Sequence, residues 1–142
     1  MANKRLVIDA NIVIRAIFGN RVRVLIERHC EMTAFYIAET NLEEAIFYTA
    51  EIAAKRGIAE SVRLAALDSL MTMIQVIPDD DLQQSRERAT KRIEHRDPDD
   101  WVAVAAALVL DCPIWTEDAD FFGAGIATWT TSTVEIYLLG LH

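Results

Sequence analysis

Carboxylate side chains recur in this sequence at spacings that can build a binding site for a metal ion. Asp9 follows the apolar segment LVI, with Asn11 two positions later, and Asp118 and Asp120 follow the apolar segment PIWT. The stretch RDPDDWVAVAAAL, residues 96–108, places three carboxylates in four positions directly before a long apolar run. Carboxylates that converge repel one another and raise one another's pKa values unless a cation lies between them. The chemistry that these residues suggest is the binding of a cation.

The available ligand types indicate which cation this is. Hard cations such as Mg²⁺ and Mn²⁺ prefer oxygen ligands, whereas zinc sites draw on Cys and His side chains. The two cysteines, Cys30 and Cys112, lie far apart, and the three histidines form no HExxH pattern. An Asp-rich calcium-binding loop is also missing from the sequence. The predicted cofactor is therefore Mg²⁺ or Mn²⁺.

Short apolar strands that alternate with helices are expected to position these acids. The predicted strands are RLVIDA at 5–10, TAFYIA at 33–38, IQVI at 74–77, PIWT at 113–116 and IATWT at 126–130. The predicted helices cover residues 11–18, 21–30, 40–55, 59–73, 82–96 and 97–110, and a last helix begins at 132. This alternation is typical of an α/β domain whose parallel sheet is covered by helices on both faces. We expect one such domain over residues 1–142.

The carboxyl ends of parallel strands share one edge of a sheet, and ligands of α/β proteins bind there. Asp9 and Asp118 come at the ends of two predicted strands. Glu43 and Glu44 fall in the first turn of the helix after the second strand, and Asp100 opens another helix. These sequence-distant acids are therefore expected at the same edge of the sheet.

Several of these acids also have a purely structural explanation. Asp97, which precedes a proline, is typical of a helix start, where a carboxylate such as that of Asp99 interacts favourably with the helix dipole. Thr40 and Glu43 have the spacing of a capping box. Asp9 is harder to explain in this way, because a buried carboxylate is costly unless something pairs with it.

The charge is distributed unevenly along the chain. All 14 Lys and Arg residues lie at or before Arg96, where 14 of the 22 Asp and Glu residues balance them. Residues 97–142 hold the other eight acids and no Lys or Arg, so the final third carries the whole net charge of −8. This imbalance favours a compensating metal ion or basic partner, and an ordinary acidic surface is the alternative.

Three segments together resemble a known family. VIDANIVIRAIF near the start, then RDPDDWVAVAAAL, then PIWTEDADF are similar, in order and spacing, to the most recognisable segments of PIN-domain nucleases. The resemblance spans about residues 5–131, and the middle section, 45–95, is supported only by its helical pattern. It implies a three-layer α/β/α sandwich with a central parallel sheet of about five strands.

The resemblance also implies a set of site residues. The first catalytic acid corresponds to Asp9, and Asn11 matches the polar residue that braces it. The second acid lies in the segment NLEEA, where Glu44 is favoured and Glu43 is the alternative, since capping already explains Glu43. The third acid is Asp100, from its position before VAVAAA.

The remaining site residues surround these acids. The fourth catalytic acid corresponds to Asp118, and Asp120 is the neighbour that assists it as a further metal ligand. Thr116 matches the hydroxyl residue often found before the fourth acid, and Asp97 and Asp99 are supporting or capping residues.

The activity implied by the resemblance is metal-dependent cleavage of RNA. One or two Mg²⁺ or Mn²⁺ ions would lower the pKa of a water molecule that attacks the phosphodiester bond. Where two ions are bound, the second would stabilise the leaving oxygen. The bacterial members of the family are often VapC-like toxins that a small antitoxin holds inactive. We therefore expect an RNA substrate, with tRNA as one candidate, an antitoxin partner and a homodimer.

A nuclease this acidic must still attract an RNA chain. Arg88, Lys91, Arg92 and Arg96 recur at three- and four-residue spacing on the helix before the acid cluster, which predicts a basic stripe for phosphate contacts. Arg15, Arg21 and Arg23 are a second candidate group. The alternative is a solvated helix face, partly paired with glutamates of the same helix.

Other functional classes fit less well. A receiver domain and a haloacid-dehalogenase-type phosphatase both collect acids at strand ends, but both need a late lysine, and no lysine follows Lys91. A catalytically inactive PIN-like module that binds RNA or a protein is the main alternative. The polar residues near the N-terminus argue against a secretory signal, and ten apolar residues are too few to span a bilayer. We expect free thiols and a cytoplasmic protein.

Overall fold

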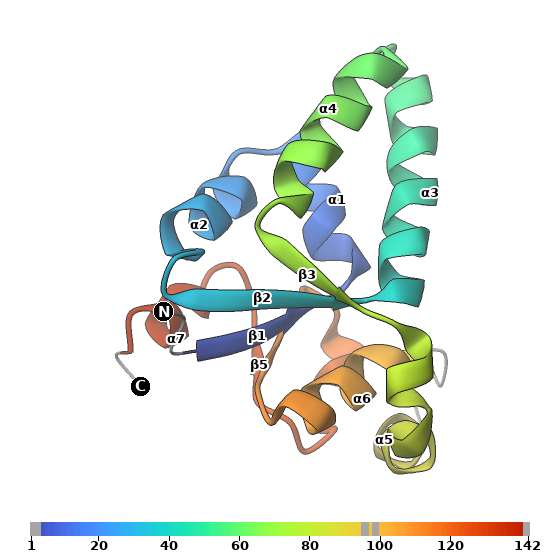
Figure 1. Cartoon of the computed structure of the whole chain (residues 1–142), viewed down its shortest axis with the longest axis vertical. Helices are drawn as coiled ribbons and strands as arrows, with labels where there is room; N and C mark the ends of the chain where they lie inside the picture. The colour runs from blue at the N-terminus through green and yellow to red at the C-terminus, as the bar shows by residue number, and fades with distance from the viewer. Residues whose placement is uncertain (1–3, 95–96, 98–99, 141–142) are drawn as a thin grey trace.

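A five-stranded parallel sheet forms the centre of the molecule, as a computed structural model of residues 4–94, 97 and 100–140 shows (Figure 1). The strands are β1 (Lys4–Ile8), β2 (Thr33–Ala38), β3 (Ile74–Ile77), β4 (Ile114–Trp115) and β5 (Thr128–Trp129). Their order is β3-β2-β1-β4-β5, and every neighbouring pair is parallel. The chain therefore winds outward from the central strand β1 in both directions, which brings the ends of β1 and β4 together.

Helices cover both faces of this sheet. On one face lie α1 (Ala10–Phe18), α2 (Arg21–His29), α3 (Glu39–Lys55) and α4 (Glu60–Met71), and α7 (Val134–Leu138) contributes to the same core. On the other face lie the short helix η1 (Asp79–Ser85), α5 (Arg86–Ile93), α6 (Trp101–Leu110) and the short helix η3 (Ala119–Phe121). The predicted three-layer α/β/α fold is confirmed. None of the described helices is long and apolar enough to cross a bilayer.

The central strand supplies side chains to two separate cores. Leu6 and Ile8 pack into the core beneath α1, α2 and α4, whereas Val7 between them packs into the core beneath α5 and α6. All three are fully buried, which is why the strand sequence is apolar without a polar alternation.

Helix α6 consists of the ten-residue apolar run WVAVAAALVL. Its residues from Val102 to Ala107 are all buried, against the sheet on one side and against α5 and η1 on the other. A helix that is apolar all round has to be enclosed in this way. Its small alanine side chains let the helix lie close to its neighbours, so α6 is a rigid support for the residue that precedes it, Asp100.

Two predicted helix starts are wrong. Helix α3 begins at Glu39 with Ala38 as its N-cap, because β2 passes into the helix without a loop. Thr40 therefore lies inside the first turn and forms no capping box with Glu43; its hydroxyl and its backbone N–H donate to Asp79 instead. Helix α6 begins at Trp101 with Asp100 as its N-cap, rather than at position 97.

The predicted polar helix over 82–96 is also divided differently. Its first part belongs to η1, a 3-10 helix that starts at Asp79, and the α-helix α5 starts only at Arg86 and ends at Ile93.

Candidate active site

Four acidic side chains from four separate segments line one pocket of about 310 Å³, which we call the acid pocket. Asp9 follows β1, Glu44 lies on α3, Asp100 precedes α6 and Asp118 follows β4. These are the four acids that the sequence analysis placed at the carboxyl edge of the sheet. The sheet topology brings Asp9 and Asp118 together, because β1 and β4 are parallel neighbours and both end at this pocket.

Asp9 is the most deeply buried of these acids, with 5% of its surface exposed. Its Oδ2 accepts hydrogen bonds from Asn11 Nδ2, at 2.9 Å, and from the Thr116 hydroxyl. Its Oδ1 is buried and has no hydrogen-bond partner in the described part of the chain. One carboxylate oxygen is thus held in place while the other remains available to a ligand.

The same two braces also hold the loop after β4. Thr116 Oγ1 accepts a hydrogen bond from the backbone N–H of Asp118 at 2.9 Å, and Asn11 Oδ1 accepts one from the N–H of Glu117 at 3.3 Å. Asp118 Oδ1 in turn accepts the N–H of Asp120 at 2.9 Å. Asn11 and Thr116 therefore position Asp118 relative to Asp9.

The electrostatics of the acid pocket oppose the charged state of its carboxyls. Burial, more than any other cause, raises the pKa of Asp9 to about 7, although the hydrogen bond from Thr116 acts in the opposite direction. Burial also raises the pKa of Asp100 to about 7, and the neighbouring acids Asp97, Asp118, Asp9 and Glu44 add repulsion. A cation in the pocket would relieve both effects.

The structure distinguishes the two candidates for the second acid. Glu44 lines the acid pocket, and its pKa is raised, first by burial and then by the charge of Asp97. Both glutamates are exposed, but Glu43 is not among the described residues that line this pocket. The geometry therefore favours Glu44.

Two further pocket residues were missed from the sequence, Asn41 and Tyr48. Asn41 is 5% exposed, its side chain lowers the pKa of Glu44 and so partly opposes the effect of burial, and its Oδ1 is buried with no partner among the described residues. Asn41, Glu44 and Tyr48 are spaced by three and four positions, so they share one face of α3. That spacing was the signal in the sequence that could have identified them.

Two of the remaining predicted acids, Asp120 and Asp97, are close to residues of the acid pocket. Asp100, Asp118 and Asp120 can each offer one oxygen such that the three oxygens lie within 4.8 Å of one another. Asp120 and Asp97 are exposed, and Asp99 lies outside the described residues.

This donor set fits a hard divalent cation. Every candidate ligand is an oxygen. In addition, Asp100 Oδ2, like Asp9 Oδ1, is buried without a hydrogen-bond partner among the described residues. Both residues line the acid pocket, so these two unpartnered oxygens are candidate ligands of a metal ion.

The described members of the predicted basic stripe do not line the acid pocket. Arg88 and Arg92 line a different pocket with Asp111, at the far end of α6, about 15 Å along the helix from Asp100. The guanidinium of Arg92 donates there to the carbonyls of the loop after η3, at 3.0 and 3.3 Å. Lys91 pairs with Glu87 at 3.5 Å. The fourth member of the predicted stripe, Arg96, lies outside the described residues.

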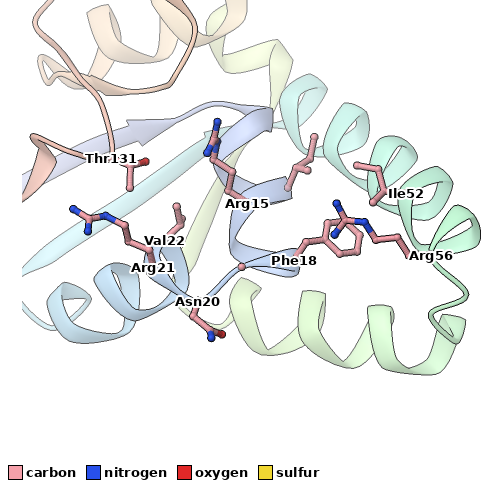
Figure 2. A pocket seen from close by; sticks show the side chains of 10 residues that line it. Arg15, Phe18, Asn20, Arg21, Val22, Ile52, Arg56 and Thr131 are labelled. Carbon is pink, nitrogen blue, oxygen red and sulfur yellow. The ribbon is translucent and has the colours of Figure 1, made fainter.

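Arg15, by contrast, lines a pocket that adjoins the acid pocket, and Ile14 lines both. We call this second cavity the basic pocket, because Arg21 and Arg56 line it as well (Figure 2).

Solved structures share this fold. PAE2754 from Pyrobaculum aerophilum has a TM-score of 0.67 at 17% identity, over 96% of this chain and 90% of that chain. VapBC2 from Rickettsia felis, bound to a promoter DNA fragment, has a TM-score of 0.66 at 12% identity, over 89% and 98%. A toxin–antitoxin complex from Klebsiella pneumoniae has a TM-score of 0.58 at 17% identity, over 89% and 97%.

Sequence comparison identifies the family. No curated protein matches this chain. The family model described as PIN domain, however, matches residues 7–139, which include all four acids of the pocket. The chain therefore belongs to the PIN-domain family.

Proposed function

We propose that this protein is an endoribonuclease that depends on Mg²⁺ or Mn²⁺ and acts as the toxin of a toxin–antitoxin pair. PIN domains are generally nucleases, and this chain retains an acidic residue on each of the four segments that line the pocket. The observation that carries the proposal is the pair of buried, unpartnered oxygens, Asp9 Oδ1 and Asp100 Oδ2. Buried carboxylate oxygens without a partner are costly, so two of them on residues that line one pocket support a bound cation.

Asp9, Asp100 and Asp118 would hold the metal ion, with Glu44 opposite them on α3 and Asp120 at the rim. A bound divalent ion lowers the pKa of a water molecule and stabilises negative charge on the phosphate oxygens during hydrolysis. Because the positions of Asp9 and Asp118 depend on the same hydroxyl, that of Thr116, the ligand geometry is preorganised before any metal binds.

Two of the structurally similar proteins support the role as a toxin. The Rickettsia felis and Klebsiella pneumoniae structures are a VapBC complex and a toxin–antitoxin complex. Exposed apolar side chains on α3 and α4, including Phe47, Tyr48 and Val62, offer surface for an antitoxin and for a second copy of the chain. We propose that the toxin is a cytoplasmic homodimer that such an antitoxin inhibits.

The test is cleavage of single-stranded RNA or tRNA with Mn²⁺ or Mg²⁺ and with EDTA. We expect cleavage only with metal, and at least about a 100-fold loss in Asp9→Asn and Asp100→Asn, because even indirect partners of metal ligands contribute about 10–100-fold. Asp111→Asn, at the opposite end of α6, makes the same chemical change and should cleave normally. Undiminished cleavage in Asp100→Asn, or equal cleavage in EDTA, would contradict the proposal.

A further inference from the structure

Three arginines surround the basic pocket, a cavity of about 370 Å³ between α1, α2 and the end of α3. Arg15 comes from α1, Arg21 is the first residue of α2, and Arg56 follows α3 (Figure 2). They come from segments far apart in the sequence, so their shared location is a property of the fold.

None of these arginines forms an ion pair with an acid in the part of the chain that the structure describes. The ion pairs found among the described residues all use other basic side chains. Arg15, Arg21 and Arg56 are all exposed, and the guanidinium of Arg56 lies over the Phe18 ring at 5.2 Å from its centre. In a protein with a net charge of −8, three uncompensated guanidinium groups around one pocket indicate that it binds an anion.

The spacing of the guanidinium groups suits an elongated anion rather than a small one. Figure 2 shows Arg21 and Thr131 on one side of the pocket and Phe18 with Arg56 on the other, with Arg15 between them. The Thr131 hydroxyl accepts a hydrogen bond from the Trp115 indole N–H at 3.2 Å, so its own proton remains available to a phosphate oxygen.

The basic pocket continues directly from the acid pocket. Ile14 lines both cavities. Arg15 lies six positions after Asp9 in the sequence and on the helix that starts next to Asp9, about 9 Å away along the helix axis. A chain whose phosphodiester bond lies in the acid pocket can therefore reach the basic pocket within a few nucleotides.

We infer that the basic pocket binds the single-stranded RNA that flanks the bond to be cleaved. Arg15, Arg21 and Thr131 contact its phosphates, and an unstacked base packs against the flat faces of Phe18 and Arg56. This inference rests on the proposed function, since it takes RNA to be the substrate. An acidic peptide would also be attracted to the arginines, but it offers no flat ring for the Phe18–Arg56 pair.

The experiment measures RNA binding without cleavage. The full-length protein is titrated, in EDTA, into a fluorescently labelled single-stranded RNA twelve-mer, and its affinity is followed by anisotropy at several salt concentrations. We expect Arg21→Gln and Arg56→Gln each to weaken binding about fivefold, and each lost phosphate contact to lower the salt slope by about 0.7. Arg56→Lys, which keeps the charge and removes the planar group, should weaken binding at an unchanged slope.

Matched controls separate the pocket from the general charge. Lys55→Gln and Arg28→Gln remove the same charge from exposed neighbours on α3 and α2 that do not line the basic pocket. These variants should bind RNA as the parent protein does. Circular dichroism confirms that each variant is folded.

Two binding results would overturn the inference. In the first, the pocket variants bind RNA as tightly as the controls do. In the second, an octaglutamate peptide displaces the RNA at an equal or lower concentration than the unlabelled twelve-mer. The second result would assign the pocket to an acidic protein segment. Cleavage measurements distinguish a failure of this inference from a failure of the nuclease proposal. RNA binding that depends on the arginines, without any metal-dependent cleavage, would refute the nuclease activity alone. Normal cleavage kinetics in an Arg21→Gln, Arg56→Gln double variant would refute the role of the basic pocket alone.

Discussion

Asp9 and Asp100 combine burial with an unsatisfied oxygen atom. Asp9 follows an apolar strand and is held by Asn11 and Thr116, while Asp100 is placed at the start of the apolar helix α6. In each carboxylate one buried oxygen lacks a hydrogen-bond partner among the described residues. A buried carboxylate oxygen without a partner is costly in the metal-free protein, and this cost is expected where the proposed metal ion would bind.

This arrangement predicts an unusual dependence of stability on pH. The pKa of Asp9 and the pKa of Asp100 are both raised from 3.8 to about 7 in the folded protein. Between these values the folded state binds more protons than the unfolded state, so the free energy of unfolding falls as the pH rises. We expect the urea midpoint of the metal-free protein to be lower at about pH 8 than at about pH 5.5.

The control for this prediction is Asp100→Asn, which removes one of the two titrating groups and should flatten the dependence. Urea titrations in EDTA, followed by circular dichroism, measure both proteins. A midpoint of the parent protein that stays constant or rises over this pH range would show that these carboxyls are not protonated in the folded state.

At the scale of elements, α6 determines how precisely Asp100 is placed. Ala105 is fully buried in a helix that contacts α5, η1 and β1. The close approach of the helix to the sheet thus depends on its small residues.

Ala105→Leu should therefore destabilise the protein by about 1–3 kcal/mol through overpacking. Val109→Leu, on the half-exposed face of the same helix, should change stability by less than about 0.5 kcal/mol. Urea denaturation at fixed pH compares the two variants. Equal midpoints for Ala105→Leu and the parent protein would mean that α6 is not tightly packed.

Most of these elements could be predicted because their patterns are local. The apolar strands and the run from Trp101 to Leu110 can be recognised from a few consecutive residues. The start of α3 could not be predicted in this way, because Thr40 has the type and spacing of a cap while β2 leads directly into the helix. Its true partner, Asp79, lies 39 positions away.

The predicted basic stripe shows a second limit of local patterns. Helical spacing indicates which residues share a face of α5, but it does not indicate which part of the folded protein that face contacts. Arg92 thus contacts the loop after η3 rather than the acid pocket. The basic pocket could be predicted only in part. Arg15 and Arg21 lie close together in the sequence, but Arg56 joins them only through the packing of α1 against α3.

At the scale of the whole molecule, the acidic final third is neutralised only in part. Glu135 pairs with Arg28 and with His29, both at 3.4 Å, so some of this charge is balanced by the first third of the chain. Asp100 and Asp118 remain together in the acid pocket, and the uncompensated arginines lie beside them. The molecule thus places a group of carboxylates beside a group of arginines, which is the arrangement that the proposed metal-dependent cleavage of a polyanion requires.

The most direct test of this account is the anomalous diffraction of a crystal of the protein grown with Mn²⁺. We predict an anomalous peak in the acid pocket, coordinated by the carboxylates of Asp9, Asp100 and Asp118, with Glu44 rather than Glu43 facing it. Asp9 Oδ1 and Asp100 Oδ2, the two unpartnered oxygens, should be among the ligands. A peak elsewhere, or no peak at a saturating concentration of Mn²⁺, would contradict the assignment of this pocket as a metal-dependent nuclease site.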